Sequence, residues 1–155
     1  NWYYDTIHNE VKKIIPGYRL LVIGRGDIGN FSNAIKSDES ITFTGPVENV
    51  AEHITRAKIC ISPLVSGAGL RGKINQYAML GKPTVSTTIG LCGTPYIHGV
   101  SVYRADDPGD FIRGIARLLT DKSYYDSMSG ECRKVVEEHF SWPRLMGKLE
   151  ALYLS

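Results

Sequence analysis

The residues best suited to chemistry lie in one glycine-rich stretch, which runs from Ser62 to Val85. It has the pattern of a strand end, a glycine turn, a short helix and the start of another strand. Gly67 and Gly69 allow a tight turn, and free amide groups at a helix start attract anions. Arg71 and Lys73 add positive charge beside these amides. This combination predicts a phosphate site; the alternative is a tight strand-to-helix turn with a solvated basic face.

The helix of this stretch, which we expect to open near Leu70, has two unlike faces. Apolar residues at helical spacing predict a face that packs on a sheet. They are Leu70, Ile74, Tyr77 and Ala78. The other stripe consists of Gly69, Gly72, Lys73 and Gln76. A helical glycine costs about 1 kcal/mol relative to alanine, so we expect a ligand that approaches the backbone closely. Ser66 is the expected N-cap, and Gly81 fits the position where the helix stops.

Length and composition are those of a single globular domain that spans residues 1–155. The 155 residues carry a formal net charge of only +2. A charge this small and dispersed argues against a nucleic-acid partner. No run approaches the roughly 20 apolar residues of a membrane span. The three cysteines, at unrelated spacings, form neither a disulfide framework nor a metal motif, and we expect Cys60 to lie in a core.

Strand-like and helix-like patterns alternate along the chain. Apolar β-prone runs predict strands at 19–24, 41–44, 59–61, 84–87 and 100–103. Helical spacing predicts helices at 2–14, 31–35, 47–57 and 122–138, one that starts after Asp107, and one that starts after Ser141. This alternation predicts an α/β fold, a doubly wound parallel sheet with helices on both faces. Ligands bind at the carboxyl ends of such strands, where three glycine turns fall: Gly24–Gly26, Gly45 and Gly67–Gly69.

Individual side chains within these elements carry further expectations. The continuous apolar run at 19–24 is typical of a parallel strand that is buried on both faces. Val50 and Ile54 are expected to face inward from their helix. Asp107 is expected to cap its helix, with a proline at the first helical position. The histidines on polar faces are expected at the surface. They are His8, His53 and His139.

Five segments in a fixed order resemble one half of the enzymes of a known family. They read Val-Ile-Gly-Arg-Gly at 22–26, Ile-Thr-Phe-Thr-Gly-Pro-Val at 41–47, Ala-Lys-Ile-Cys-Ile-Ser-Pro-Leu at 57–64, and Gly-Ala-Gly-Leu-Arg-Gly-Lys-Ile at 67–74, followed by Tyr-Ala-Met-Leu-Gly-Lys-Pro-Thr-Val at 77–85. Over nearly all of residues 1–155 the chain is similar to the C-terminal, donor-binding domain of glycosyltransferase family 4 (glycosyl transferases group 1) enzymes. The resemblance therefore implies the Rossmann-like fold of a GT-B C-terminal domain.

The resemblance also implies a function. The domain would bind a nucleoside-diphosphate sugar, which a retaining enzyme transfers to a glycan, lipid-linked or small-molecule acceptor. Arg71 and Lys73 would be catalytic, because they stabilise charge on the leaving diphosphate. The implied donor-binding residues are Gly24, Arg25, Pro46, Val47, Ser66, Gly67, Ala68, Gly69, Leu70 and Gln76. Family precedent requires neither a metal nor a cofactor.

The sequence departs from the family pattern at two acidic positions. The family's two glutamates, eight positions apart, fall on Ala68 and Gln76. A glutamine can still form hydrogen bonds with ribose hydroxyls, without charge. The alternative is a non-catalytic nucleotide-sugar-binding or interaction module of the same fold. A sugar-nucleotide epimerase would need acids and a histidine that we cannot place.

The resemblance further implies a longer parent protein. The family's first strand and its N-terminal acceptor domain would precede Asn1, so we expect the chain to be a fragment that is inactive alone. The parent is expected to be a cytoplasmic enzyme of polysaccharide biosynthesis. Peripheral association with the inner face of the membrane is part of this expectation.

Overall fold

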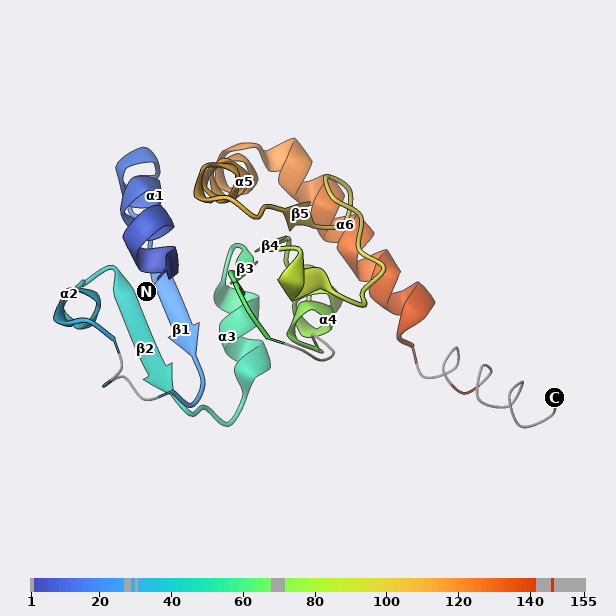
Figure 1. Ribbon diagram of the computed structural model, residues 1–155. Helices are drawn as coiled ribbons and strands as arrows, with labels where there is room; N and C mark the ends of the chain where they lie inside the picture. Colours follow the sequence, from blue (N-terminus) through green and yellow to red (C-terminus); the bar gives the residue numbers. More distant parts are fainter. Residues whose placement is uncertain (1, 27–28, 30, 68–71, 142–145, 147–155) are drawn as a thin grey trace.

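The computed structural model describes residues 2–26, 29, 31–67, 72–141 and 146, in which strands and helices alternate (Figure 1). The strands are β1 (Leu20–Ile23), β2 (Ile41–Gly45), β3 (Cys60–Ser62), β4 (Thr84–Ser86) and β5 (Tyr103–Arg104). The α-helices are α1 (Asn9–Ile14), α2 (Asn33–Lys36), α3 (Val50–Arg56), α4 (Gly72–Met79), α5 (Pro108–Thr120) and α6 (Lys122–His139). A π-helical turn, η1 (Tyr4–His8), precedes α1, and a 3-10 turn, η3 (Ile89–Leu91), follows β4.

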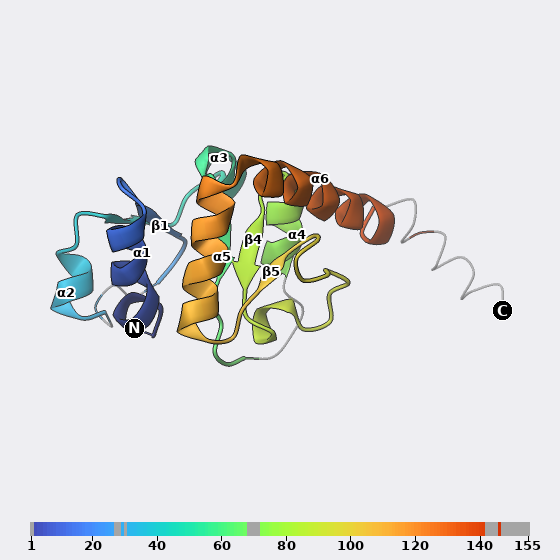
Figure 2. The same ribbon diagram turned by 90° about the horizontal axis from the view of Figure 1, so that it is seen from above.

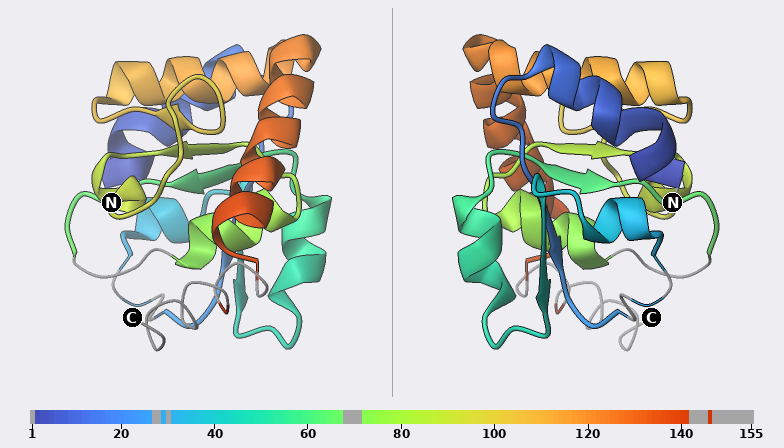
Figure 3. Two further views of the ribbon diagram at one scale, coloured as in Figure 1. Left: turned by 90° about the vertical axis from the view of Figure 1, so that its right-hand side faces the viewer. Right: turned by 90° about the vertical axis from the view of Figure 1, so that its left-hand side faces the viewer.

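Every strand pairing among these elements is parallel, as predicted. The strands form two sheets, one ordered β1-β2 and the other β3-β4-β5. Helices α1 and α5 lie on one side of β3 and β4, and α3 and α4 lie on the other (Figure 3). Figure 2 shows α6 leaving the end of α5 and running past α4. The predicted α/β class, with helices on both faces of parallel strands, is confirmed.

Two burial predictions are wrong. The Leu21 side chain in β1 is 38% exposed, although the run at 19–24 was expected to be buried on both faces. The reason is that, within the described part of the chain, β1 pairs with β2 alone and its other edge has no neighbouring strand. Val50 is 40% exposed while Ile54 is buried. The helix begins at Val50 instead of residue 47, because the Asn49 side chain caps it by accepting a hydrogen bond from the Ala51 amide at 3.1 Å.

The last strand is shorter and later than predicted. It was expected at 100–103, but β5 comprises only Tyr103–Arg104. Residues 97–102 instead form a turn, in which the Ser101 amide donates to the Ile97 carbonyl at 3.0 Å and the Ser101 Oγ accepts from the Ile97 amide at 2.9 Å. Gly99 has a φ of +77°, a conformation that suits this turn and interrupts a strand.

Helix ends follow the predicted chemistry. The Asp107 side chain caps α5 by accepting from the Asp110 amide at 2.9 Å. Helix α4 ends at a Schellman motif, in which Gly81 has a φ of +65°. In this motif the Gly81 amide donates to Ala78 and the Lys82 amide to Tyr77, both at 2.9 Å. The expected cap of α4 near Ser66 and the helix expected after Ser141 depend on residues outside the described part of the chain.

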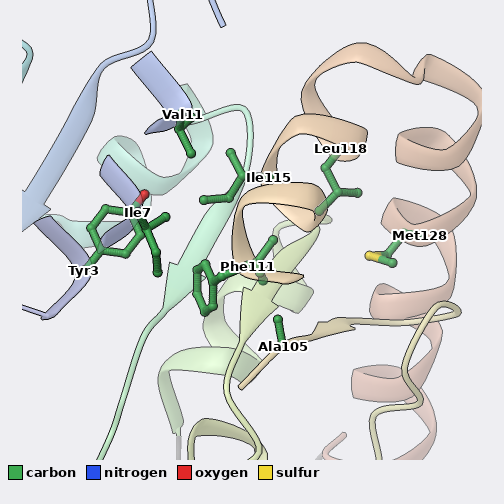
Figure 4. Packing of buried hydrophobic residues seen from close by; sticks show 9 residues of the cluster. Tyr3, Ile7, Val11, Ala105, Phe111, Ile115, Leu118 and Met128 are labelled. Atoms are coloured by element: carbon green, nitrogen blue, oxygen red, sulfur yellow. The ribbon is translucent and has the colours of Figure 1, made fainter. Parts of the chain in front are cut away.

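The main hydrophobic core joins the N-terminal helix to α5 (Figure 4). Phe111 of α5 lies at its centre, with edge-on contacts to the rings of Trp2 and Tyr3, both at 6.0 Å between centroids. The buried cluster consists of Tyr3, Ile7, Val11, Val85, Ala105, Phe111, Ile115, Leu118 and Met128. A smaller cluster between α4 and α6 contains Ala78, Cys132 and Val136. Cys60 is buried, as predicted.

His8 was expected at the surface, and this prediction is wrong because its side chain is fully buried. The π-helical turn accommodates an extra residue, so Ile7 and its neighbour His8 both face inward. The ring stacks on Tyr4 with centroids 5.5 Å apart, and its Nε2 lies 2.9 Å from Ser40 Oγ. His53 is half-buried and His139 is exposed.

Candidate functional site

The first two glycine turns meet at the carboxyl ends of β1 and β2. The Gly24 amide donates to the Gly45 carbonyl at 3.1 Å. Gly24 has a φ of +121° and Gly45 a φ of +66°, values that favour glycine because a side chain would be strained there. Arg25 and Pro46, which follow these glycines, are exposed, and Val47 is half-buried. The structure thus places the first two segments of the predicted donor site side by side.

The third turn follows β3. Gly67 has a φ of +122°, again in the region that favours glycine. Ser66 and Gly67 are both exposed. The predicted site residues Ala68, Gly69, Leu70 and Arg71 lie outside the described residues. The described residues on either side of this segment are Gly67, after β3, and Gly72, at the start of α4.

Helix α4 presents the two unlike faces that its sequence predicts. Ile74 and Ala78 are buried, while Lys73 and Gln76 are exposed on the opposite side. Neither Lys73 nor Gln76 makes a hydrogen bond or ion pair with another described residue. A Cβ added at Gly72 would meet no described atom within 4 Å, so packing against the described residues does not require this glycine. The described part of this stripe, Gly72, Lys73 and Gln76, is thus exposed.

Helix α4 is held firmly from three directions. The Tyr96 hydroxyl donates to the Asn75 side chain at 2.9 Å. The Ser129 hydroxyl of α6 donates to the Gly81 carbonyl at 2.6 Å. The Lys82 ammonium, just past the helix, donates to the carbonyls of Thr55 at 2.7 Å and Ala57 at 2.8 Å. These contacts make α4 a rigid support for the side chains on its exposed stripe.

Hydroxyl groups after β4 support the same edge, and the sequence reasoning missed them. The Thr87 hydroxyl donates to the Leu64 carbonyl at 2.6 Å, which ties the loop after β4 to the loop after β3. The Thr88 amide and hydroxyl donate to the two carboxylate oxygens of Asp106 at 2.7 and 2.6 Å. These hydrogen bonds lower the pKa of Asp106. These hydroxyl groups could have been predicted from the run Ser86-Thr87-Thr88 at the end of a strand.

Gly90 brings the backbone of η3 against these hydroxyls. Its amide donates to the Thr87 hydroxyl at 3.1 Å. A Cβ at Gly90 would overlap Ser86 Oγ and would lie 3.0 Å from Ser62 Oγ. Gly90 is therefore packed against the ends of β3 and β4, and a larger residue there would require Ser86 to shift.

The described residues include no group of three or more histidine, cysteine, aspartate or glutamate residues that could hold a metal. His98 Nδ1 accepts from the Arg104 amide at 2.9 Å, so this nitrogen supports the turn before β5. No described helix is long and apolar enough to cross a membrane. The exposed cations and glycine turns are suited to binding an anionic ligand.

Two cavities of the described structure lie away from these residues. One, of about 460 Å³, is lined by residues around Lys12 and Asp38. The other, of about 750 Å³, lies between β1 and the segment at 59–61. Neither is lined by Lys73, Gln76 or the glycine turns.

Comparison with known proteins identifies the family. Residues 1–121 match the family model described as glycosyl transferases group 1. The chain belongs to this family. No curated protein sequence matches it.

Several solved structures share the fold of this family member. HepE from Anabaena, in complex with UDP and glucose, superposes with a TM-score of 0.80 at 12% identity, over 97% of this chain and 44% of HepE. Sucrose-phosphate synthase from Thermosynechococcus elongatus gives 0.71 at 20% identity, over 87% of this chain and 37% of the synthase. WaaG, a glycosyltransferase involved in lipopolysaccharide biosynthesis, gives 0.68 at 15% identity, over 84% and 38%. The chain thus spans less than half the length of these proteins.

Proposed function

We propose that this chain is the donor-binding domain of a retaining glycosyltransferase, which transfers a sugar from a nucleoside diphosphate to a glycan, lipid-linked or small-molecule acceptor. Membership of glycosyl transferases group 1 supports this proposal. HepE, which has the same fold, has been solved in complex with UDP-glucose. Two observations carry the proposal: the junction of the Gly24 and Gly45 turns at the carboxyl ends of β1 and β2, and the exposed Lys73 and Gln76 of α4.

Each part of this edge has a proposed role toward the donor. Gly24 and Arg25 approach the phosphates, and Pro46 and Val47 lie against the base. Backbone amides from Ser66 to Leu70 bind the sugar and the distal phosphate. Gln76 binds the ribose hydroxyls as a neutral hydrogen-bonding group.

The proposed catalytic step is stabilisation of the leaving group. The bond between the sugar's anomeric carbon and the diphosphate oxygen breaks, and its electron pair remains on the diphosphate. The acceptor hydroxyl oxygen bonds to that carbon and gives up its proton to the departing diphosphate or to a base outside this domain. Lys73, together with Arg71, lowers the barrier because their positive charges face the charge that develops there. A helix N-terminus alone supplies about 0.3–1 kcal/mol, so the two cations carry most of this effect.

The complete reaction requires more protein than this domain. The chain spans 44% of the length of HepE. We therefore place the acceptor site, and any base that acts on the acceptor, in an N-terminal domain of a longer protein. The domain alone is then expected to bind the donor without transferring the sugar.

A non-catalytic donor-binding module is the second candidate, favoured by the neutral Gln76 and by Ala68, which stand where the family has glutamates. The two candidates differ in turnover. A transferase is expected to release the nucleoside diphosphate from its donor in the full-length protein, whereas a module binds the donor and leaves it intact. Donor hydrolysis and transfer assays on the full-length protein distinguish them.

Calorimetric titration with UDP, GDP and their sugars tests the binding proposal. We expect saturable binding of one nucleotide series, and a Kd at least about tenfold higher for Lys73→Ala, because a hydrogen bond to a charged group contributes about 1.5–3 kcal/mol. Lys122→Ala is the matched control, since Lys122 is an exposed lysine of α6 whose ammonium pairs with Asp126. No saturable binding, or equal weakening by both substitutions, contradicts the proposal.

A further inference from the structure

The loop that follows β3 is joined to the rest of the described structure through one side chain. This loop, residues 63–67, contains Ser66 and Gly67, to which we assign part of the donor site. The Thr87 hydroxyl donates to the Leu64 carbonyl at 2.6 Å. No other hydrogen bond links residues 63–67 to another described residue. Within the described structure, Thr87 therefore provides the polar anchor of this loop.

Thr87 is itself fixed by the backbone around it. Its amide donates to the Ser62 carbonyl at 3.3 Å, which extends the parallel pairing of β3 with β4. Its hydroxyl accepts from the Gly90 amide at 3.1 Å, and its side chain is only 3% exposed. A hydroxyl group has one proton to donate and two lone pairs that accept. The bond from Gly90 therefore leaves the Thr87 proton free for the Leu64 carbonyl.

The turn after Thr87 is supported from the next strand. The Thr88 amide and hydroxyl donate to the Asp106 carboxylate at 2.7 and 2.6 Å, and Asp106 lies just past β5. Within η3, a Cβ at Gly90 would overlap Ser86 Oγ, so this turn packs directly on the end of β4. These contacts hold Thr87 in place. Thr87 thus connects the loop after β3 to a rigid part of the sheet.

Beyond Leu64 the loop has little other support among the described residues. Val65 is 57% exposed, and Ser66 and Gly67 are exposed as well. Gly67 has a φ of +122°, and glycine loses more conformational freedom on ordering than any other residue. Because burial contributes little here, the constraint at Leu64 decides how often Ser66 and Gly67 occupy one position.

We propose that Thr87 is a positioning residue for the sugar donor. By holding the Leu64 carbonyl, it keeps the amides of Ser66 and Gly67 where the distal phosphate and the sugar bind. This inference rests on the donor-binding role proposed above for these amides. Thr87 acts through the loop, because its hydroxyl is already engaged by Gly90 and Leu64. When only a fraction of the molecules holds the loop in the competent position, the apparent Kd rises by the inverse of that fraction.

The proposed roles divide the donor into two parts. The base and the ribose lie at Val47 and Gln76, outside this loop, whereas the loop after β3 takes the distal phosphate and the sugar. Loss of the Thr87 hydroxyl is therefore expected to weaken the binding of a nucleoside diphosphate and to leave the binding of the monophosphate nearly unchanged. A hydrogen bond contributes about three- to tenfold to an equilibrium constant, which sets the size of the expected effect.

Calorimetric titration of the full-length protein with UMP, UDP and UDP-glucose tests the proposal; the guanosine series replaces them if the wild type binds that series. Thr87→Ala is expected to raise the Kd for the diphosphate and its sugar about three- to tenfold, and the Kd for the monophosphate less than about twofold. Thr87→Ser keeps the hydroxyl and is expected to bind like the wild type. Equal Kd values in Thr87→Ala and the wild type, or equal weakening of monophosphate and diphosphate binding, overturn the proposal.

Thr84→Ala is the matched control. Thr84 begins the same strand and is also 3% exposed, and its hydroxyl donates to the Lys82 carbonyl at 3.2 Å. The same substitution there removes a buried threonine hydroxyl at the other end of β4, so it is expected to leave all these Kd values unchanged. Thr87→Val, which removes the hydroxyl and keeps the branched shape, replaces Thr87→Ala if the latter does not fold. A loss of diphosphate binding in Thr84→Ala as large as that in Thr87→Ala contradicts the proposal.

The order of the loop gives a readout that needs no nucleotide. In the ligand-free full-length protein, the NMR order parameters of the Ser66 and Gly67 amides are expected to be lower in Thr87→Ala than in the wild type, and unchanged in Thr84→Ala. Unchanged order parameters in Thr87→Ala overturn the inference and leave the proposed function intact. A wild type that binds none of these nucleotides overturns the proposed function, and this inference with it.

Discussion

One titratable side chain of the N-terminal helical segment points into the interior of the protein. His8 is fully buried, and its Nε2 lies 2.9 Å from Ser40 Oγ and 3.5 Å from the Asp38 carboxylate. Asp38 also accepts from Lys12 at 3.0 Å. Burial lowers the pKa of His8, and the nearby Asp38 charge offsets only part of this effect. Burial raises the pKa of Asp38, but hydrogen bonds from Ser40 and Lys12 outweigh it and hold this pKa well below its usual range.

These pKa directions predict a loss of stability in acid. The unfolded chain protonates His8 near pH 6.5, whereas the folded protein does so only at lower pH. The contribution of His8 is therefore complete above about pH 6.5 and is lost as the pH falls, by at most about 1.4 kcal/mol per pH unit. Asp38 acts in the same direction, but only below its unfolded pKa of about 4. Urea unfolding between pH 7.5 and 5 measures the His8 effect without that of Asp38.

Variants separate His8 from the other histidines. His8→Gln is expected to remove most of the dependence of the unfolding free energy on pH above 5, whatever its absolute stability. His139→Gln, at an exposed position of α6, is expected to retain that dependence. The same slope in both variants shows that His8 is not the source. The sequence pattern could not predict this burial, because it depends on a π-helical turn and on Ser40, 32 positions away.

Local signals in the sequence predict where elements begin and end. The Asp107 cap and the Gly81 stop are formed within a few residues, so the sequence contains all that they need. The positions of Leu21 and Val50 depend on partners elsewhere in the fold, and both predictions were wrong. The features of the candidate site likewise include some that local sequence predicts and some that it does not. The exposed stripe of α4 follows from periodicity, whereas the bonds from Thr87 to Leu64 and from Thr88 to Asp106 join separate loops.

Two helical glycines have opposite roles, which gives a prediction for the helices. A Cβ at Gly114 of α5 would overlap the Tyr103 ring of β5, whereas a Cβ at Gly130 of α6 meets nothing within 4 Å. Gly114→Ala is expected to lower the unfolding free energy by about 1–3 kcal/mol, because the ring must move. Gly130→Ala is expected to raise it by about 0.5–1 kcal/mol through helix propensity.

Chemical denaturation of the two variants measures both changes. Circular dichroism at a fixed denaturant concentration reports them on one scale. If Gly114→Ala is as stable as Gly130→Ala, close packing of α5 on β5 does not constrain this helix. The pair tests packing with one and the same substitution, so side-chain chemistry does not differ between the variants.

Across the whole molecule, the two sheets are joined by helix packing instead of by strand pairing among the described residues. The Phe111 ring contacts Trp2 and Tyr3 of the N-terminal segment and lies in one buried cluster with Val85 of β4. Composition and periodicity predicted the parallel α/β class, because the alternation of elements is local. They could not predict the division into two sheets, because hydrogen-bond pairing between strands is not encoded in periodicity. The core therefore has to hold β1-β2 against β3-β4-β5 (Figure 4).

Removing the Phe111 ring tests this role. Phe111→Ala is expected to lower the unfolding free energy by about 3–5 kcal/mol, because it leaves a cavity between α5 and the N-terminal helix. Phe31→Ala is the matched control, since Phe31 is half-buried and pairs with Phe43 at 5.3 Å, away from that junction. Its loss is expected to be smaller. Urea denaturation, monitored by the fluorescence of Trp2 beside Phe111, measures both losses of unfolding free energy. Equal losses in the two variants mean that this junction does not hold the sheets together.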